Sequence, residues 1–340
     1  MSKVRQNQKP KSQGFGLWTL DFGLHPNTAM RVTANTFSDS LIDQLNALST
    51  RQQRLQNQAT TGQRIQLPED DPAAMERVLN LQTEGKAVAQ FKSNIAHLTD
   101  MAQASYGVMT GLKKISDRAG ELATLADGTK SPADLKLYAT ELTQLIKQGV
   151  QLTQAKFQGN YLLSGTRSDQ PPFALGMDAN GNVTSVTYQG NESVPESEVA
   201  EGVTLSSQVV GANGSGTGPR GLITDSRFGA DFFNHLISLQ NHLLAGDTGA
   251  ITATDRPALG MDEENIVAHL GNNGAVQARL EASAAIASSR GDSLEGRVSK
   301  EADADLAQTL VRLSQTQNAY QVALQSGAKL LSQSLLDYLH

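Results

Sequence analysis

Two stretches near the ends of this 340-residue chain repeat apolar residues at the alternating three- and four-residue spacing of a coiled-coil heptad. As helices, each would extend ~40–50 Å at about 1.5 Å per residue. No other part of the chain can bury these apolar surfaces, so we expect the two stretches to pair with each other and then with further copies. The first is carried by Leu41, Leu45, Leu48, Leu55 and Ala59, and the second by Leu306, Leu310, Leu313, Gln317, Tyr320, Leu324, Leu331 and Tyr338.

The second stretch carries little charge. From Leu306 to His340 its charged residues are Arg312, Lys329 and Asp337. An ordinary solvated helix has a charged outer face, whereas here that face is Gln, Ser, Ala, Thr and Asn, which lose little solvation energy when neighbours cover them. We therefore favour an assembly interface over the alternative, the core of an ordinary helical bundle. The residues expected in the interface are Leu41, Leu45, Leu48, Leu55, Leu306, Leu310, Leu313, Tyr320, Leu324, Leu331 and Leu335.

Composition removes several classes of function. The chain has no cysteine, which excludes disulfide scaffolds, thiolate metal sites and thiol catalysis. A net charge of −6 without basic clusters argues against a nucleic-acid or anionic-membrane surface. No apolar run reaches the roughly 18 residues of a membrane span. The beginning lacks the apolar core and cleavage site of a secretory signal, so export would not use a cleaved signal peptide.

The pattern between the ends predicts a rod of long helices. Thr33–Thr61 is helical, with a break at Gly62. A second helix begins at Pro72 with Asp71 as its N-cap and continues to Leu125. A third begins at Ser131–Pro132 and runs to Leu152.

The character of the sequence changes near Gly159. Between 159 and 225, Gly, Asn, Val and Thr dominate, and 183–188 alternates as a strand does. Helical periodicity returns over 232–244, a loop follows through Pro257, and a long helical region begins at Asp262 with an expected break near Gly291–Gly296. The predicted fold class is mainly α with a β-rich insertion: a long antiparallel rod or coiled coil formed by both termini, and a small central β domain.

The candidate chemical motifs are weak. His235 and His242 lie seven apart and could share a helix face, but the six histidines contain no H-E-x-x-H pattern. The acidic group 69–71 precedes Pro72, which favours a helix start over a metal site. The glycine-rich run 211–218 lacks the lysine of a phosphate-binding loop, so a flexible loop is expected. Ser164 is not in a G-x-S-x-G turn. We expect no enzyme, no metal site and no cofactor.

Three motifs resemble the bacterial flagellin superfamily. TGQRI at 61–65 and DDPA at 70–73 resemble the segment after the first helix of that family, and 298–305 leading into LSQTQ at 313–317 resembles the start of its last helix. FQGNYLLSGT at 157–166, with Pro172–Phe173 and the ending SLLDYL at 334–339, is similar to the hook–filament junction branch of the superfamily. The resemblance extends from Met30 to the end.

The resemblance implies a structural role. The chain would form a ring of copies between hook-associated protein 1 and the flagellin filament, outside the cell in the flagellum. It would be exported by the type III flagellar apparatus, with an export chaperone at its C-terminal helix. The alternative within the family is the filament flagellin itself, which the motif at 157–166 and the ending argue against.

We expect the following domains. Residues 33–61 and 301–340 would form the terminal assembly domain, 62–158 and 226–300 a helical rod, and 159–225 a β-rich outer domain. Residues 1–29 have no helical period and no counterpart in the family. They are either an untranslated upstream extension, with Met30 as the initiator, or a disordered arm.

Overall fold

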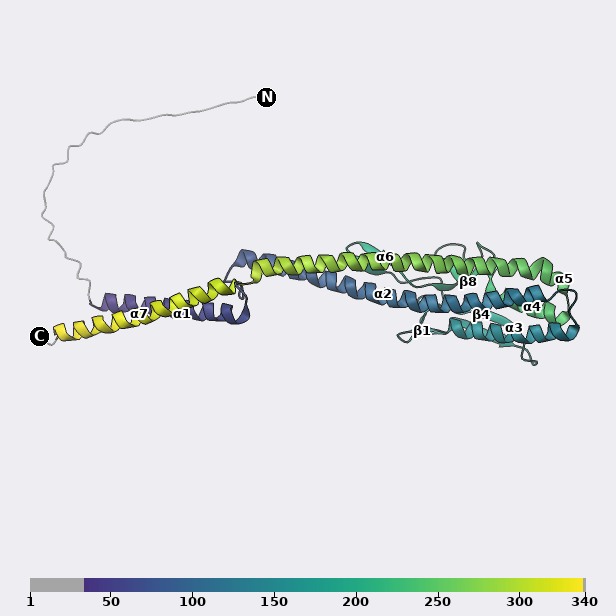
Figure 1. The fold of residues 1–340 in the computed structure, drawn as a ribbon, viewed down its shortest axis with the longest axis horizontal. Coiled ribbons are helices and arrows are strands. Elements are labelled where there is room, and N and C mark those ends of the chain that lie inside the picture. Colours follow the sequence, from purple (N-terminus) through teal and green to yellow (C-terminus); the bar gives the residue numbers. More distant parts are fainter. Residues whose placement is uncertain (1–33, 339–340) are drawn as a thin grey trace, which may run out of the picture. The chain divides into compact units, whose positions relative to one another are not determined.

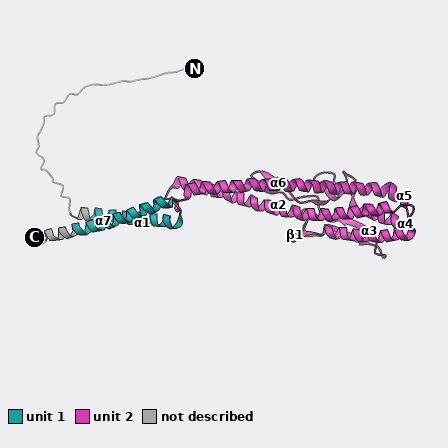
Figure 2. Ribbon diagram, viewed as in Figure 1, with its two compact units in different colours: residues 1–62, 304–340 teal, residues 63–303 magenta. Residues whose placement is uncertain are grey.

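The computed structural model describes residues 34–338, and their side chains over 39–329. The prediction for 1–29 lies outside the described residues. The described chain forms two compact units, residues 1–62 with 304–340 and residues 63–303 (Figure 2). We call them the terminal unit and the rod unit.

The terminal unit is a pair of helices. α1 covers Ala34–Thr61 and α7 covers Leu306–Tyr338. The two lie side by side (Figure 1). The predicted pairing of the first and last helical stretches is therefore confirmed within one chain.

The rod unit is built on two long helices, α2 (Pro72–Leu125) and α6 (Arg256–Ala302), which lie side by side over much of their length (Figure 1). α3 (Pro132–Thr153) and α4 (Phe232–Ala245) pack against each other, and α3 also packs on α2. Where these helices meet, they enclose the main core. Its largest fully buried side chains include Phe232, Phe233, Met109, Leu112, Leu142 and Ile146.

Nine short strands lie between α3 and α4 and form four small sheets within the described residues. Two-stranded antiparallel sheets are formed by β1 (Lys156–Phe157) with β2 (Asn160–Tyr161), by β3 (Phe173–Met177) with β4 (Val183–Tyr188), and by β5 (Ser197–Ala200) with β6 (Val203–Leu205). β7 (Val210–Asn213) runs parallel to β8 (Gly221–Asp225), and β8 runs antiparallel to β9 (Ala230–Asp231). The fold class predicted from the sequence, mainly α with a small central β region, is confirmed. The separation of 159–225 as a domain of its own stays a prediction.

Helix side-chain amides attach three of the strands. Gln240 of α4 is fully buried, donates to the carbonyl of Val183 in β4 at 3.0 Å and accepts from its N–H at 3.4 Å. Asn265 of α6 donates to the first two carbonyls of β8 at 2.9 and 2.8 Å. Asn94 of α2 donates to the carbonyl of Glu198 in β5 at 2.8 Å. Because sheets of two or three short strands leave backbone groups without partners, these amides supply hydrogen bonds that a larger sheet would provide.

Two predicted irregularities in the last third of the chain are wrong. α6 runs without a break through Gly291 and Gly296. An interior glycine costs a helix only about 1 kcal/mol, and packing along α2 offsets that cost. The expected loop before Asp262 is also absent. A short helix α5 (Thr248–Ala250) and a π-helical turn (Ile251–Asp255) lead directly into α6. Pro257 lies in the first turn of α6, where a missing N–H is tolerated.

Candidate assembly interface

The helices of the terminal unit run antiparallel and pack closely at Gly327. Near one end of the pair, the carbonyl of Gly62 accepts from the N–H of Ala304 at 2.8 Å. Near the other end, Gly327 lies against Leu41, and a Cβ added to the glycine would be 2.5 Å from Leu41 Cδ2. A larger residue at this position would have to displace Leu41, so the glycine permits the close approach of the two helices.

The buried positions of both helices follow one heptad. From 306 to 329, six residues of α7 are not exposed, and they alternate four and three apart. We call these residues and the α1 positions that face them the seam. On α7 the seam consists of Thr309, Leu313, Thr316, Tyr320, Ala323 and Gly327; on α1 it consists of Leu41, Leu45, Leu48, Gln52, Leu55 and Ala59.

The predicted interface residues divide into two groups. Leu41, Leu45, Leu48 and Leu55 of α1 and Leu313 and Tyr320 of α7 are buried or half-buried in the seam. Leu306, Leu310 and Leu324 are instead 48%, 55% and 45% exposed. The leucine stripe of α7 is therefore rotated by about 60° from the surface that α1 covers, at about 100° per residue. The side chains of Leu331 and Leu335 lie outside the described residues.

Sequence reasoning followed leucines and therefore missed five seam residues: Gln52 of α1 and Thr309, Thr316, Ala323 and Gly327 of α7. A close approach of two helices requires small side chains. The hydroxyl of Thr316 donates to the carbonyl of Arg312 at 2.8 Å, so burial of Thr316 leaves no donor unpaired. The available signal was the unbroken four–three spacing itself, in which Gly327 looked like an imperfection.

α7 exposes apolar side chains on two sides. Beside the leucine stripe, Val311 and Val322 are 56% and 61% exposed on the side facing away from the seam. Between Leu306 and Lys329 the only charged residue apart from Lys329 itself is Arg312. Full burial of such a leucine or valine contributes about 1.5–3 kcal/mol, so α7 has surface available for neighbours that α1 does not cover.

In the rod unit, residues of the motif at 61–73 connect the start of α2 to the end of α6. The N–H of Arg64 donates to the carbonyl of Ala302 at 2.6 Å, and its guanidinium donates to the carbonyl of Glu301 at 2.7 Å. Gln63 and Asp303 form an antiparallel bridge. Arg77 forms an ion pair with Glu301 at 2.9 Å. The arginine of the TGQRI motif therefore joins the beginning of the rod unit to its end.

The acidic pair of the same motif shapes a loop and starts a helix. Asp70 accepts from the N–H groups of Gln66 and Leu67 at 3.0 and 3.1 Å. Asp71 accepts from the N–H of Ala74 at 3.0 Å as the N-cap of α2, and this bond lowers the pKa of its carboxyl. The interpretation of these carboxylates as a helix start is confirmed.

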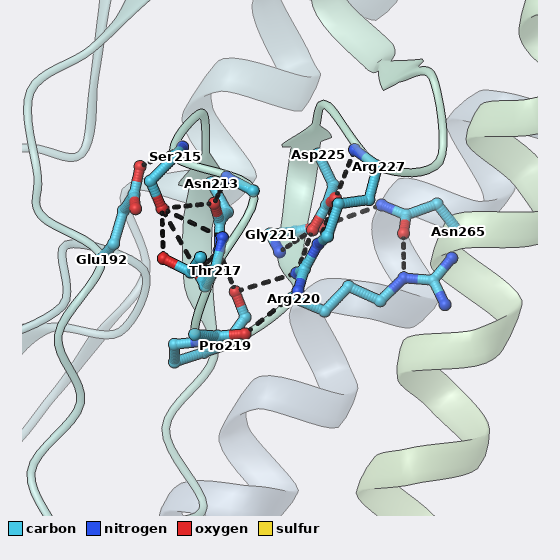
Figure 3. A network of polar contacts seen from close by, with 12 residues as sticks. Glu192, Asn213, Ser215, Thr217, Pro219, Arg220, Gly221, Asp225, Arg227 and Asn265 are labelled. Carbon is cyan, nitrogen blue, oxygen red and sulfur yellow. Dashed lines mark hydrogen bonds and ion pairs between the residues drawn. The ribbon is translucent and has the colours of Figure 1, made fainter.

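The glycine-rich run at 211–218 is held in place by side chains (Figure 3). One carboxylate oxygen of Glu192 accepts from the N–H groups of Gly214 and Ser215 at 2.8 and 3.3 Å. Asn213 is fully buried and donates to the carbonyls of Thr217 and Pro219, both at 2.6 Å. The run does form an anion cradle, but the anion is the protein's own carboxylate. The run is a loop from Gly214 to Gly218, as expected, and its flexibility stays a prediction.

Asp225 anchors the other side of this network (Figure 3). Its carboxylate is buried, accepts from the N–H of Gly221 at 3.0 Å, and forms an ion pair with Arg227 at 2.7 Å. Burial alone would raise the pKa of Asp225, but the hydrogen bonds from Arg227 and Gly221 outweigh it and lower the pKa to about 2. The carboxylate is therefore charged throughout the physiological range.

The two histidines considered as a pair each bind a different carboxylate. Nδ1 of His235 lies 2.7 Å from Asp262, and Nδ1 of His242 lies 2.7 Å from Asp255. Asp262 raises the pKa of His235, and burial raises the pKa of Asp262. The two pairs join α4 to α6 and to the π-helical turn before α6. The sequence analysis likewise favoured a structural role for these histidines over metal binding.

The described residues contain no cluster of three or more His, Asp or Glu side chains suited to a metal. Among the same residues, no helix is long and apolar enough to cross a membrane.

Comparison with known proteins finds that this chain is similar to flagellar proteins. Residues 32–168 match the model of the bacterial flagellin N-terminal helical region. Flagellin D of Vibrio anguillarum is 29% identical over 170 residues, which is 48% of this chain and 44% of the relative. The chain thus aligns with less than half the length of that curated relative.

Two solved structures share the fold. A putative flagellar hook-associated protein from Vibrio parahaemolyticus is 20% identical, with a TM-score of 0.58 over 69% of this chain and 100% of the other. FlgL of Xanthomonas campestris is 16% identical, with a TM-score of 0.51 over 63% of this chain and 98% of the other. At under 25% identity these two structures show a shared fold, and the flagellin family model matches residues 32–168 of this chain.

Proposed function

We propose that this chain is a structural subunit of the bacterial flagellum and forms the junction between hook-associated protein 1 and the flagellin filament, the position of hook-associated protein 3. The observation that carries the proposal is the uncovered apolar surface of α7. A helix with three exposed leucines, two exposed valines and little charge is suited to burial among several neighbours. One of the solved structures that share the fold is a putative flagellar hook-associated protein by name, which supports the same position.

Assembly would couple ordering of the terminal helices to binding. The α1–α7 pair by itself buries a seam in which small and polar residues alternate with leucines, so it gains little from pairing alone. Copies packed around it would add the leucine stripe and the outer valines to the buried surface. The interface residues predicted from the sequence would then fill two successive contacts: the seam within a copy, and the stripe between copies.

Deletion of the gene tests the proposal. Cells without the junction subunit would keep their hooks but would release flagellin into the medium instead of building filaments. Cells that still carried normal filaments and released no flagellin would refute the junction assignment. Leu310→Asp and Leu324→Asp, both exposed in the monomer, should abolish complementation while leaving the circular dichroism of the purified chain unchanged.

A second candidate is the filament flagellin, because the family model and the curated relative are both flagellins. It predicts that the purified chain polymerises with copies of itself into long filaments. A junction subunit would stop at a short ring and would need a template. Electron microscopy of the purified chain, seeded with isolated hooks or unseeded, separates the two.

The partners follow from the same proposal. Beyond its own copies, the chain would contact hook-associated protein 1 on one side and flagellin on the other. It would reach the outside of the cell through the type III flagellar apparatus, with a chaperone bound to α7 beforehand. Removal of residues 306–340 should abolish chaperone capture in a pull-down from the cytoplasm, whereas capture that survived the truncation would place the chaperone elsewhere. We propose no catalytic role.

A further inference from the structure

Most of the charges on the last part of α6 are divided between two sides of the helix. The exception is Glu301, which lies on the cationic side and is paired with Arg77. At about 100° per residue, Arg279, Arg290, Arg297 and Lys300 lie within about 80° of one another. Glu281, Asp292 and Glu295 lie within about 60° of one another on a different side. All seven residues are exposed. A helix that only needed solubility would mix the two signs along each side.

An apolar groove lies on the cationic side. It has a volume of about 690 Å³, and α2, α6 and β5 line it. Its apolar walls include Phe91 and Val88 of α2, Val199 of β5, and Ile286 of α6, which is 70% exposed. An exposed isoleucine at the edge of an apolar groove indicates a surface that a partner covers.

The groove continues into a second, basic depression. The two share Asn80 and Glu84. The second is also lined by Arg297, Lys300 and the Arg77–Glu301 ion pair. Glu84 is paired with Arg290 in the groove. Within the described residues, Arg297 and Lys300 form no ion pair, so this end has cations available for a partner's carboxylates.

The acidic side of α6 offers the complementary surface. Beside its carboxylates, at the next positions around the helix, the exposed residues are small, so this strip of α6 is a low ridge with negative charge along one edge. The small residues are Ala278, Ala282, Ala285, Ser289 and Gly296. Small side chains allow a second backbone to approach closely, as Gly327 does in the seam. In the described chain, Glu281, Asp292 and Glu295 also form no ion pair.

We propose that the groove of one copy receives the acidic ridge of α6 from a second copy. The inference rests on the proposed assembly of copies and names the surfaces through which their rod units meet. Ile286 and Phe91 would lie against the alanines of the ridge, and Arg297 and Lys300 would face Asp292 and Glu295. Because both surfaces are on every copy and differ from each other, the contact is head-to-tail, and it closes into a ring when the rotation between copies allows.

Cysteine cross-linking tests the geometry directly, because the chain has no cysteine of its own. Ser283 lines the groove and Ser289 lies on the ridge. The double variant Ser283→Cys/Ser289→Cys, isolated with the flagella and oxidised, should give a ladder of linked copies on a non-reducing gel. Each single variant should stay monomeric. Dimers from either single variant would indicate a symmetric contact and overturn the proposal, as would an absence of links in the double variant.

Charge reversal provides an independent test. Arg297→Glu/Lys300→Glu and Asp292→Lys/Glu295→Lys should each lower the fraction of cells with filaments about tenfold, and the two together should restore it. Lys136→Glu, an exposed reversal on α3, is the matched control and should have no effect. Failure of the combined variant to recover, with each pair alone impaired and the purified chains folded, would overturn the proposal. If the gene deletion releases flagellin while neither pair has an effect, the proposed function stands and this contact fails.

Discussion

Asp225 should give the rod unit a measurable loss of stability in acid. Its carboxylate is buried and charged, and the pKa falls from 3.8 to about 2 on folding. Since the folded pKa is the lower one, the stabilisation is complete above pH 3.8 and disappears as the pH falls through 3.8 toward 2. At about 1.4 kcal/mol per pKa unit, the fall corresponds to about 2–3 kcal/mol.

The comparison of wild type with Asp225→Asn isolates this contribution, because the other carboxylates titrate in both proteins and cancel. At pH 7 the variant should unfold at lower urea concentration, since Arg227 loses its ionic partner and the Gly221 N–H faces a neutral amide. Between pH 5 and pH 2 the difference in unfolding free energy should shrink by about 2–3 kcal/mol. Urea titrations at five or six pH values, followed by circular dichroism, give the curve. A difference that stays constant over this range would refute the assignment of a charged, stabilised Asp225.

Three further predictions concern contacts elsewhere in the fold. Gly327→Ala should be destabilising or neutral in the wild type but stabilising by about 1 kcal/mol in a Leu41→Ala background, because the smaller residue leaves room for the new methyl group. Hydrogen exchange of α7 in the wild type, the two single variants and the double variant measures the coupling between the two positions. Additive effects of the two substitutions would contradict the prediction. The pairing of His235 with Asp262 raises the histidine pKa. The pair therefore stabilises the folded state fully below pH 6.5, and this stabilisation declines as the pH rises above that value. His235→Gln should remove this decline from the melting temperature between pH 6 and 9, and an unchanged melting profile would exclude the pair as the source of the decline. Gln240→Leu should lower the free energy of unfolding by about 1–3 kcal/mol, because it leaves the buried backbone groups of Val183 in β4 without partners. A chemical denaturation curve equal to that of wild type would show that water replaces the amide.

The helices could be predicted from the sequence because their signals are local. The N-cap at Asp71, the proline after it and the apolar spacing through Leu125 define α2 without any knowledge of its neighbours. The continuous α6 was harder to predict, since Gly291 and Gly296 weaken the local signal and only packing along α2 explains why the helix continues.

The interface could be predicted only in part. The heptad spacing predicts that α1 and α7 pair. It does not decide which of the two adjacent stripes of α7 faces α1. Leu313 and Tyr320 belong to both stripes, whereas Leu310 belongs only to the exposed one. Gly327 favours the stripe that faces α1, because Leu41 lies against a residue that has no side chain.

The network around Asp225 had no readable signal. Its partners come from positions 192, 213, 221 and 227, and their spacing matches no motif. The glycine-rich run suggested a ligand site because backbone N–H groups do gather there. Sequence alone does not show that Glu192, twenty-two residues earlier, already occupies them.

The helix amides that attach the strands also bear on how this chain can be engineered. Gln240, Asn265 and Asn94 bind backbone atoms, so they do not depend on which side chains the strands carry. The turn between β3 and β4 takes no part in these three amide bonds. Asp178 accepts from the N–H groups of Asn180 and Asn182, and Lys147 of α3 donates to the carbonyl of Gly181 at 3.0 Å. Foreign peptide inserted at Asn180–Gly181 would therefore leave every helix-to-strand bond intact. The region is a display site that the rod can present in many copies without changing its own fold.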